Sequence, residues 1–156
     1  MQNLVQFSVF LVNKPGVLSQ VCSELARAKV NITAMAMMDS MEHGVLRLIT
    51  DAPDRTRQVL RKLNIPTTET EVLAVSMPNR PGAVADVCDR LTQGHIHISY
   101  VYCTTSDKGG RTVVIFKVSD MRKAMKLIED HRNERRDMKI KVRRPQMGRV
   151  VAGMRR

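Results

Sequence analysis

Apolar residues recur at every second position in two stretches of the chain, Phe7–Leu11 and Leu73–Met77. This alternation predicts two β-strands. A Pro-Gly pair follows each strand, and proline is favoured in the first turn of a helix. The apolar residues that come next are spaced as one stripe of an amphipathic helix. The stripe consists of Val17, Leu18, Val21, Cys22 and Leu25 in the first stretch, and of Ala83, Val84, Val87, Cys88 and Leu91 in the second.

These two stretches belong to an internal repeat. The segment 13–22 recurs as 79–88, at an offset of 66 positions. Across residues 13–32, seven positions are identical at that offset: Asn13, Pro15, Gly16, Val21, Cys22, Leu25 and Ile32. Such agreement indicates a tandem duplication of one unit, and repeats of this kind determine the fold.

The remaining patterns complete each unit in the same order. Second strands are predicted over 30–38 and 96–103, third strands over 45–50 and 113–118, and short terminal strands over 67–71 and 138–142. A second helix is predicted after Asp51 or Asp120, which are suitable N-cap residues. The order βαββαβ, twice, predicts an α+β fold with two ferredoxin-like units. Each would be an antiparallel four-stranded sheet with two helices on one face.

The second strand of each unit is apolar on both sides, with Ala34 and Ala36 on one side and Met35 and Met37 on the other. A sheet with one face in water should alternate more strictly. We therefore expect the other unit or another chain to bury part of the face without helices.

Charge is distributed unevenly along the 156 residues. The net charge is +11, but residues 131–156 contain ten Lys or Arg against two acids, so most of the basicity lies there. No apolar run has the roughly 20 residues of a membrane span, and the chain starts without the pattern of a signal peptide. We expect no membrane association and a cytoplasmic location.

Few residues suggest catalysis. The three cysteines have no metal-ligand spacing. Cys22 and Cys88 lie on the apolar stripes and are interpreted as core residues. Ser/His/Asp and phosphate-loop patterns are absent from the sequence. We expect a protein that is not an enzyme and has neither a cofactor nor a metal site.

The two strand–helix turns, Asn13–Gly16 and Asn79–Gly82, are the best candidates for chemistry. Glycine permits a close approach of the backbone, and the first N–H groups of a helix suit a carboxylate. The alternative is that each turn only starts a helix.

The repeated pattern of apolar strand, Asn-Lys/Arg-Pro-Gly turn, amphipathic helix and second strand resembles the ACT domain, a small regulatory module of amino-acid metabolism. The resemblance covers residues 4 to about 142 and implies ACT-like domains at 1–70 and 71–142, followed by a basic tail at 143–156. It also implies an amino-acid site at an interface between ACT domains, lined by Asn13, Gly16, Val17, Leu18 and Asn31, and by Asn79, Gly82, Ala83, Val84 and His97. Because His97 replaces Asn31 in the second unit, the two sites should differ.

The resemblance implies a non-catalytic, amino-acid-binding regulatory protein, expected to form a homodimer and to act on a separate enzyme or regulator. The alternative is an interaction module without a ligand, which would contact nucleic acid or an acidic partner through the basic tail. The third strands lack the aromatic-rich pattern with which RNA-recognition domains stack on bases, so nucleic-acid binding by the sheet is not expected.

Overall fold

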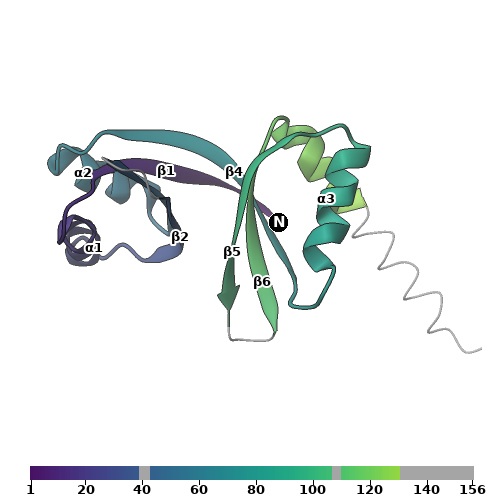
Figure 1. Cartoon of the computed structure of the whole chain (residues 1–156), viewed down its shortest axis with the longest axis horizontal. Helices are drawn as coiled ribbons and strands as arrows, with labels where there is room; N and C mark the ends of the chain where they lie inside the picture. The colour runs from purple at the N-terminus through teal and green to yellow at the C-terminus, as the bar shows by residue number, and fades with distance from the viewer. Residues whose placement is uncertain (39–42, 107–109, 131–156) are drawn as a thin grey trace, which may run out of the picture.

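The computed structural model describes residues 1–38, 43–106 and 110–130 (Figure 1). Its strands and helices are β1 (Gln2–Val12), α1 (Val17–Arg27), β2 (Ile32–Met38), β3 (His43–Thr50), α2 (Pro53–Lys62), β4 (Thr67–Pro78), α3 (Ala83–Gln93), β5 (Ile98–Ser106) and β6 (Arg111–Val118). Residues 121–130 form a further helix. The predicted strand at 138–142 and the tail at 143–156 lie outside the described residues. We refer to residues 1–70 and 71–130 as the first and second halves.

The six strands of the described ranges belong to one antiparallel sheet in the order β2-β3-β1-β4-β6-β5. The long strands β1 and β4 lie side by side at its centre (Figure 1). Residues 5–9 of β1 pair with 67–71 of β4, and residues 2–4 pair with 72–74. The start of β1 therefore lies beside the second half's part of β4, where a fourth strand of that half would lie.

This sharing of strands corrects one expectation. The antiparallel α+β arrangement is confirmed, but the strands of the described residues form one six-stranded sheet and not two separate four-stranded sheets. The strands predicted at 67–71 and 73–77 are a single strand, because β4 continues without a break from one half into the other. The sequence pattern does not show this continuity, since alternation is the same whether two strands are joined or separate.

The helices cover one face of the sheet and enclose two apolar clusters. Phe7, Val9 and Leu11 of β1 pack with Val21 and Leu25 of α1 in the first half. The matching cluster of the second half joins β4 and β6 to α3 and the 121–130 helix. Its members include Leu73, Val75, Val87, Leu91, Phe116 and Ile128. The predicted stripes thus face the core of each half, as hydrophobic burial requires, except at Val84, which is 40% exposed.

The face without helices is also partly buried, as the apolar second strand predicts. The sheet curls so that its edge strands β2 and β5 come into contact. A third cluster forms there from Ala34, Ile49, Val72, Ala74 and Ile115, with the half-buried Tyr100 and Tyr102 packed against it. The two halves therefore bury this face against each other within one chain.

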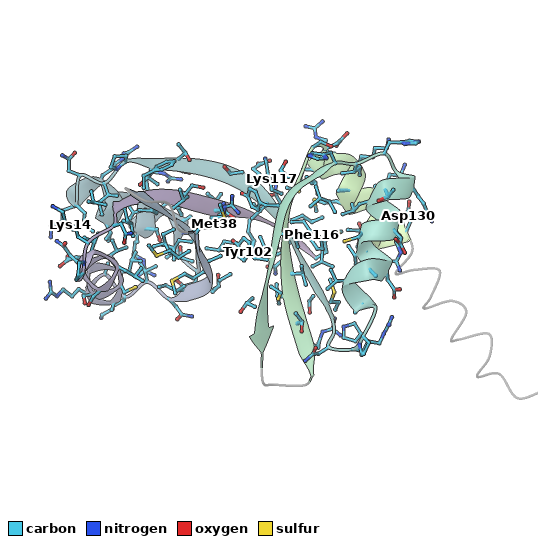
Figure 2. The ribbon with its side chains drawn as sticks, in the orientation of Figure 1. Lys14, Met38, Tyr102, Phe116, Lys117 and Asp130 are labelled. Carbon is cyan, nitrogen blue, oxygen red and sulfur yellow. The ribbon has the colours of Figure 1, made fainter. Side chains whose placement is uncertain are left out.

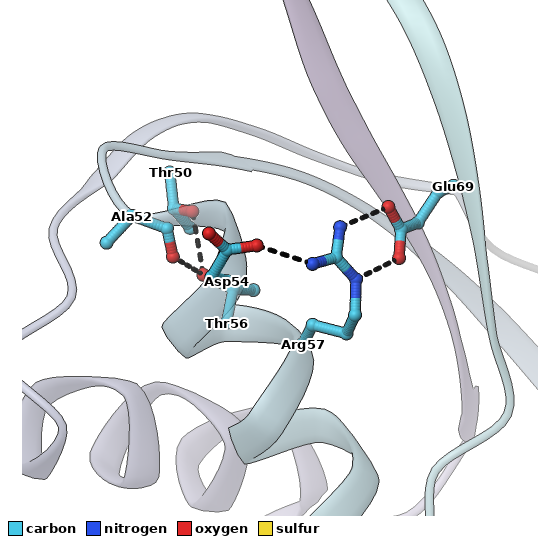
Figure 3. A network of polar contacts seen from close by, with 6 residues as sticks. All are labelled: Thr50, Ala52, Asp54, Thr56, Arg57 and Glu69. Carbon is cyan, nitrogen blue, oxygen red and sulfur yellow. Dashed lines mark hydrogen bonds and ion pairs between the residues drawn. The ribbon is translucent and has the colours of Figure 1, made fainter.

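Helix α2 is attached to the sheet by polar contacts (Figure 3). Arg57 donates to both carboxylate oxygens of Glu69 on β4, at 2.6 and 2.7 Å, and to Asp54 at 2.6 Å. Thr56 donates to the Ala52 carbonyl at 3.0 Å and contacts the Thr50 hydroxyl at 2.7 Å. These contacts fix the start of α2 over the ends of two strands.

One predicted N-cap is correct and the other is wrong. Asp120 accepts from the backbone N–H of Lys123 at 2.9 Å, the bond that an N-cap makes. In the first half the N-cap residue is Ala52, whereas Asp51 accepts from the N–H of Asn31 at 2.9 Å. Asp51 fails as a cap because its carboxylate holds the start of β2 instead.

Candidate functional site

The two strand–helix turns have the backbone conformation for which glycine is suited. Gly16 has φ 89° and Gly82 has φ 80°, and both are in the left-handed region at the N-cap of their helices. Neither helix receives a side-chain cap. The first N–H groups of a helix have no partner inside it, and its positive dipole end favours an anion. The glycines therefore present two helix starts of the same design.

The turns lie at opposite ends of the molecule. Helix α1 follows the end of β1 in the first half, and α3 follows the end of β4, which runs antiparallel to β1. Figure 2 shows Lys14 of the first turn far from Phe116 and Asp130 of the second half. One ligand cannot touch both turns of the same chain.

Asn31 and His97 each lie at the opposite end of the strands from the turn of their own half. Each sits just before an edge strand, where backbone hydrogen bonds join Asn31 to Asp51 and His97 to Ser119. In the first half, the pairing of β3 with its neighbouring strands places Thr50 next to Asn31 and Gly44 next to the turn. The six-residue separation along β3 corresponds to about 20 Å at about 3.4 Å per residue. The structure does not bring these predicted site residues together within one half.

The apolar members of the predicted site differ in exposure. Val17 and Leu18 are half-buried and pack against the first core cluster. Ala83 is buried, whereas the side chain of Val84 is 40% exposed. Asn13 and Asn79 are exposed. The second turn therefore combines an exposed apolar side chain with a small residue that points into the core.

A cavity of about 180 Å³ lies beside the second turn, and sequence analysis missed most of it. Its lining comes from the N-terminal residue, β4, the second turn, α3, β6 and the 121–130 helix. It consists of Met1, Val75, Ser76, Met77, Pro78, Arg80, Ala83, Asp86, Val87, Arg90, Arg111 and Ile128. Only Ala83 belongs to the predicted site. Arg80 and Asp86 could have been noticed from their places in the turn and first helical turn, but Arg111 is brought there by the pairing of β6 with β4.

Charged groups surround this cavity. Arg80 donates to Asp86 at 2.5 Å and to the Pro81 carbonyl at 3.0 Å. Arg111 donates to the hydroxyl and the carbonyl of Ser76, both at 2.9 Å. With Arg90, three arginines and one aspartate line the cavity. The excess of positive charge favours an anionic group at its rim.

The structure gives little support for other chemistry. Burial, and then the neighbouring Asp89, raises the pKa of the Cys88 thiol, which favours the unreactive protonated form. Among the residues described, no group of three or more His, Cys, Asp or Glu side chains is placed to hold a metal ion. The described helices include none long and apolar enough to cross a membrane.

Comparisons with known proteins identify a family and similar structures for this fold. The sequence model of the ACT domain pair matches residues 2–137. A protein of Bacteroides thetaiotaomicron is similar in structure at 29% identity, with a TM-score of 0.78, covering 83% of this chain and 89% of its own. No curated protein matches the chain.

Two other structures share the fold at lower identity. The ligand-free regulatory subunit of aspartate kinase from Thermus thermophilus is 11% identical with a TM-score of 0.61, covering 83% of this chain and 93% of its own. An aspartate kinase of Clostridium acetobutylicum is 15% identical with a TM-score of 0.51. That match covers 85% of this chain but 34% of the kinase. With the family match spanning nearly all of the described residues, the chain belongs to the ACT domain pair family.

Proposed function

We propose that this protein is a non-catalytic regulatory module that binds an amino acid at its strand–helix turns. The observation that carries the proposal is the pair of uncapped helix starts behind Gly16 and Gly82. Each offers backbone N–H groups and a positive dipole end to a carboxylate. The similarity to a regulatory subunit of aspartate kinase supports a regulatory role.

The proposed site includes Asn13, Gly16, Val17 and Leu18 in the first half, and Asn79, Gly82, Ala83 and Val84 in the second. Because the turns lie at opposite ends of the chain, the proposed ACT–ACT interface at each site forms with another copy in a homodimer. Asn31 and His97 lie about 20 Å from the turns of their own halves, at about 3.4 Å per strand residue. Neither contacts the turn of its own half, so in this proposal each joins a site from that other copy.

The proposed mechanism is a shift between two packing arrangements of the dimer. An amino acid held from both sides of an interface stabilises the arrangement that closes on it. The change would then pass to a separate enzyme or regulator, with the two sites linked reciprocally. The proposed domains are 1–70 and 71–142, although β4 runs across that boundary without a break.

A thermal-denaturation screen of the full chain against the twenty amino acids tests this function. A ligand at about 100 times its Kd adds about 2.7 kcal/mol to the free energy of unfolding, which raises Tm. We expect one chemically related group of amino acids to raise Tm, and sedimentation to show a dimer. No shift with any amino acid would contradict the proposal.

A further inference from the structure

We propose that the two halves are not equivalent, and that the cavity of the second half is a site for an apolar α-amino acid. This inference rests on the proposed function, but it specifies which half binds, where the ligand side chain goes and what kind of side chain is accepted. The cavity opens beside the turn of Asn79–Gly82 and lies between α3 and the helix-covered face of the sheet. All of the residues that line the cavity belong to one chain, and the partner copy of the proposed dimer would meet it only at the turn.

The cavity and its rim match the three parts of an apolar amino acid: the side chain, the carboxylate and the ammonium group. Its inner wall is aliphatic, with Val75, Met77, Val87 and Ile128 all buried. An apolar void of about 150 Å³ is large enough to hold benzene, so 180 Å³ accommodates the side chain of valine, leucine, isoleucine or methionine. Burying that side chain provides the hydrophobic part of the binding.

The charged groups at the rim match the carboxylate and the ammonium group of the ligand. Arg80, Arg90 and Arg111 lie on the lining and suit the ligand carboxylate, since guanidinium–carboxylate bonds are charge-assisted and frequently bidentate. Asp86, on the first turn of α3, suits the ammonium group. Asp86 already accepts from Arg80, so the ligand would join an existing ion pair and not introduce an unpaired charge.

The first half lacks this combination at the equivalent positions. At the repeat offset, Ala83 is replaced by the larger Val17, and Asp86 by the uncharged Gln20. Arg90 is replaced by Glu24, which reverses the charge, and Glu24 forms an ion pair with Arg27. A carboxylate that the second half attracts would be repelled by Glu24 in the first half.

Calorimetric titration of the full chain with three probes of one shape tests the ligand chemistry. L-leucine carries both charged groups, 4-methylpentanoate lacks the ammonium, and 3-methylbutylamine lacks the carboxylate. We expect leucine to bind at one site per chain, and each of the other two to bind at least tenfold more weakly. Equal affinity for leucine and 4-methylpentanoate would overturn the role of Asp86. Stronger binding of L-glutamate than of leucine would overturn the apolar cavity.

A matched pair of substitutions tests the location. Ala83→Val gives the second half the residue of the first and fills part of the cavity, so leucine affinity should fall at least tenfold. Ala85→Val makes the same change at an exposed position of α3 that does not line the cavity, and it should leave affinity unchanged. Circular dichroism and Tm without ligand confirm that both variants fold. If Ala83→Val binds leucine normally, the cavity is not the site although the chain still binds an amino acid. If no amino acid binds the unaltered chain, both the inference and the proposed function fail.

A third variant keeps the location testable if Ala83→Val does not fold. Arg111→Gln alters the rim from β6, without touching α3 or the turn, and shortens a side chain that is exposed. We expect leucine to bind at least tenfold more weakly while 3-methylbutylamine, which has no carboxylate, is unaffected. Equal loss for both probes would show a general disturbance of the cavity and would contradict a carboxylate contact.

Discussion

Gln6 donates through its side-chain amide to the Tyr100 hydroxyl over 2.7 Å, although the two residues lie 94 positions apart. The amide oxygen of Gln6 also accepts from the Tyr102 hydroxyl at 2.9 Å. Gln6 is fully buried, and Arg47 of the first half lies 3.5 Å above the ring of Tyr100. This network joins β1 and β3 to β5 across the curled face of the sheet, and so holds the two halves together.

Replacing Gln6 should weaken the whole molecule. Gln6→Leu keeps the volume but leaves the two tyrosine hydroxyls without their partner, so we expect a loss of about 1–3 kcal/mol in the free energy of unfolding. Urea denaturation measures it. Gln2→Leu, an exposed change on the same strand, is the control and should cost little. In the double variant with Tyr102→Phe, the loss in the free energy of unfolding should be smaller than the sum of the losses in the two single variants. Full additivity would show that the hydrogen bond contributes nothing.

Tyr102 should make the protein sensitive to high pH. Burial raises the pKa of Tyr102 well above its usual value, with the nearby Tyr100 adding to the effect and Arg47 opposing it. Between about pH 10, where an unfolded tyrosine ionises, and the higher folded pKa, the unfolded state binds fewer protons. Stability should therefore fall as pH rises through this window. Tyr102→Phe should lessen the fall, which Tm measured from pH 8 to 11 would show. Parallel curves would contradict this prediction.

Glu69 should contribute to stability in a way that is lost at acidic pH. Its hydrogen bonds from Arg57 lower the pKa of the carboxyl, despite an opposing effect of burial. The stabilisation is present above the usual glutamate pKa and is lost as pH falls through the lowered value. Because both side chains are partly exposed, we expect Glu69→Gln to cost only about 0.5–1 kcal/mol at pH 7. The cost should disappear near pH 2. Glu71→Gln, exposed on the same strand, is the control; an equal effect would argue against the Arg57 contact.

Replacing Gly16 should lower the free energy of unfolding because of its backbone conformation alone. A Cβ at this position would meet no atom within 4 Å, but φ is 89°. Gly16→Ala should therefore cost about 1–2 kcal/mol, whereas Gly16→Asn should cost less because asparagine tolerates this region better. Urea denaturation distinguishes the two variants. Equal costs would indicate that the turn rearranges.

The sequence alone determined the repeated units, most of the strands and helices, the faces that pack inward and the need for glycine at 16 and 82. These are local properties. Periodicity reports which side of an element is buried, and a Pro-Gly pair reports a turn, whatever lies elsewhere in the chain. The same patterns correctly indicated that part of the face without helices is buried, although Met35 and Met37 on the other side of β2 are 48% and 47% exposed.

Other features depended on which strands became neighbours. The pairing of residues 2–4 with 72–74 joined the halves in one sheet, and it is invisible in the alternation because every strand in the sheet shares that period. The curl of the sheet placed Gln6 against Tyr100. The pairing of β4 with β6 placed Arg111 beside Ser76 at the cavity. Each of these contacts joins residues at least 35 positions apart, so only the tertiary structure decided them.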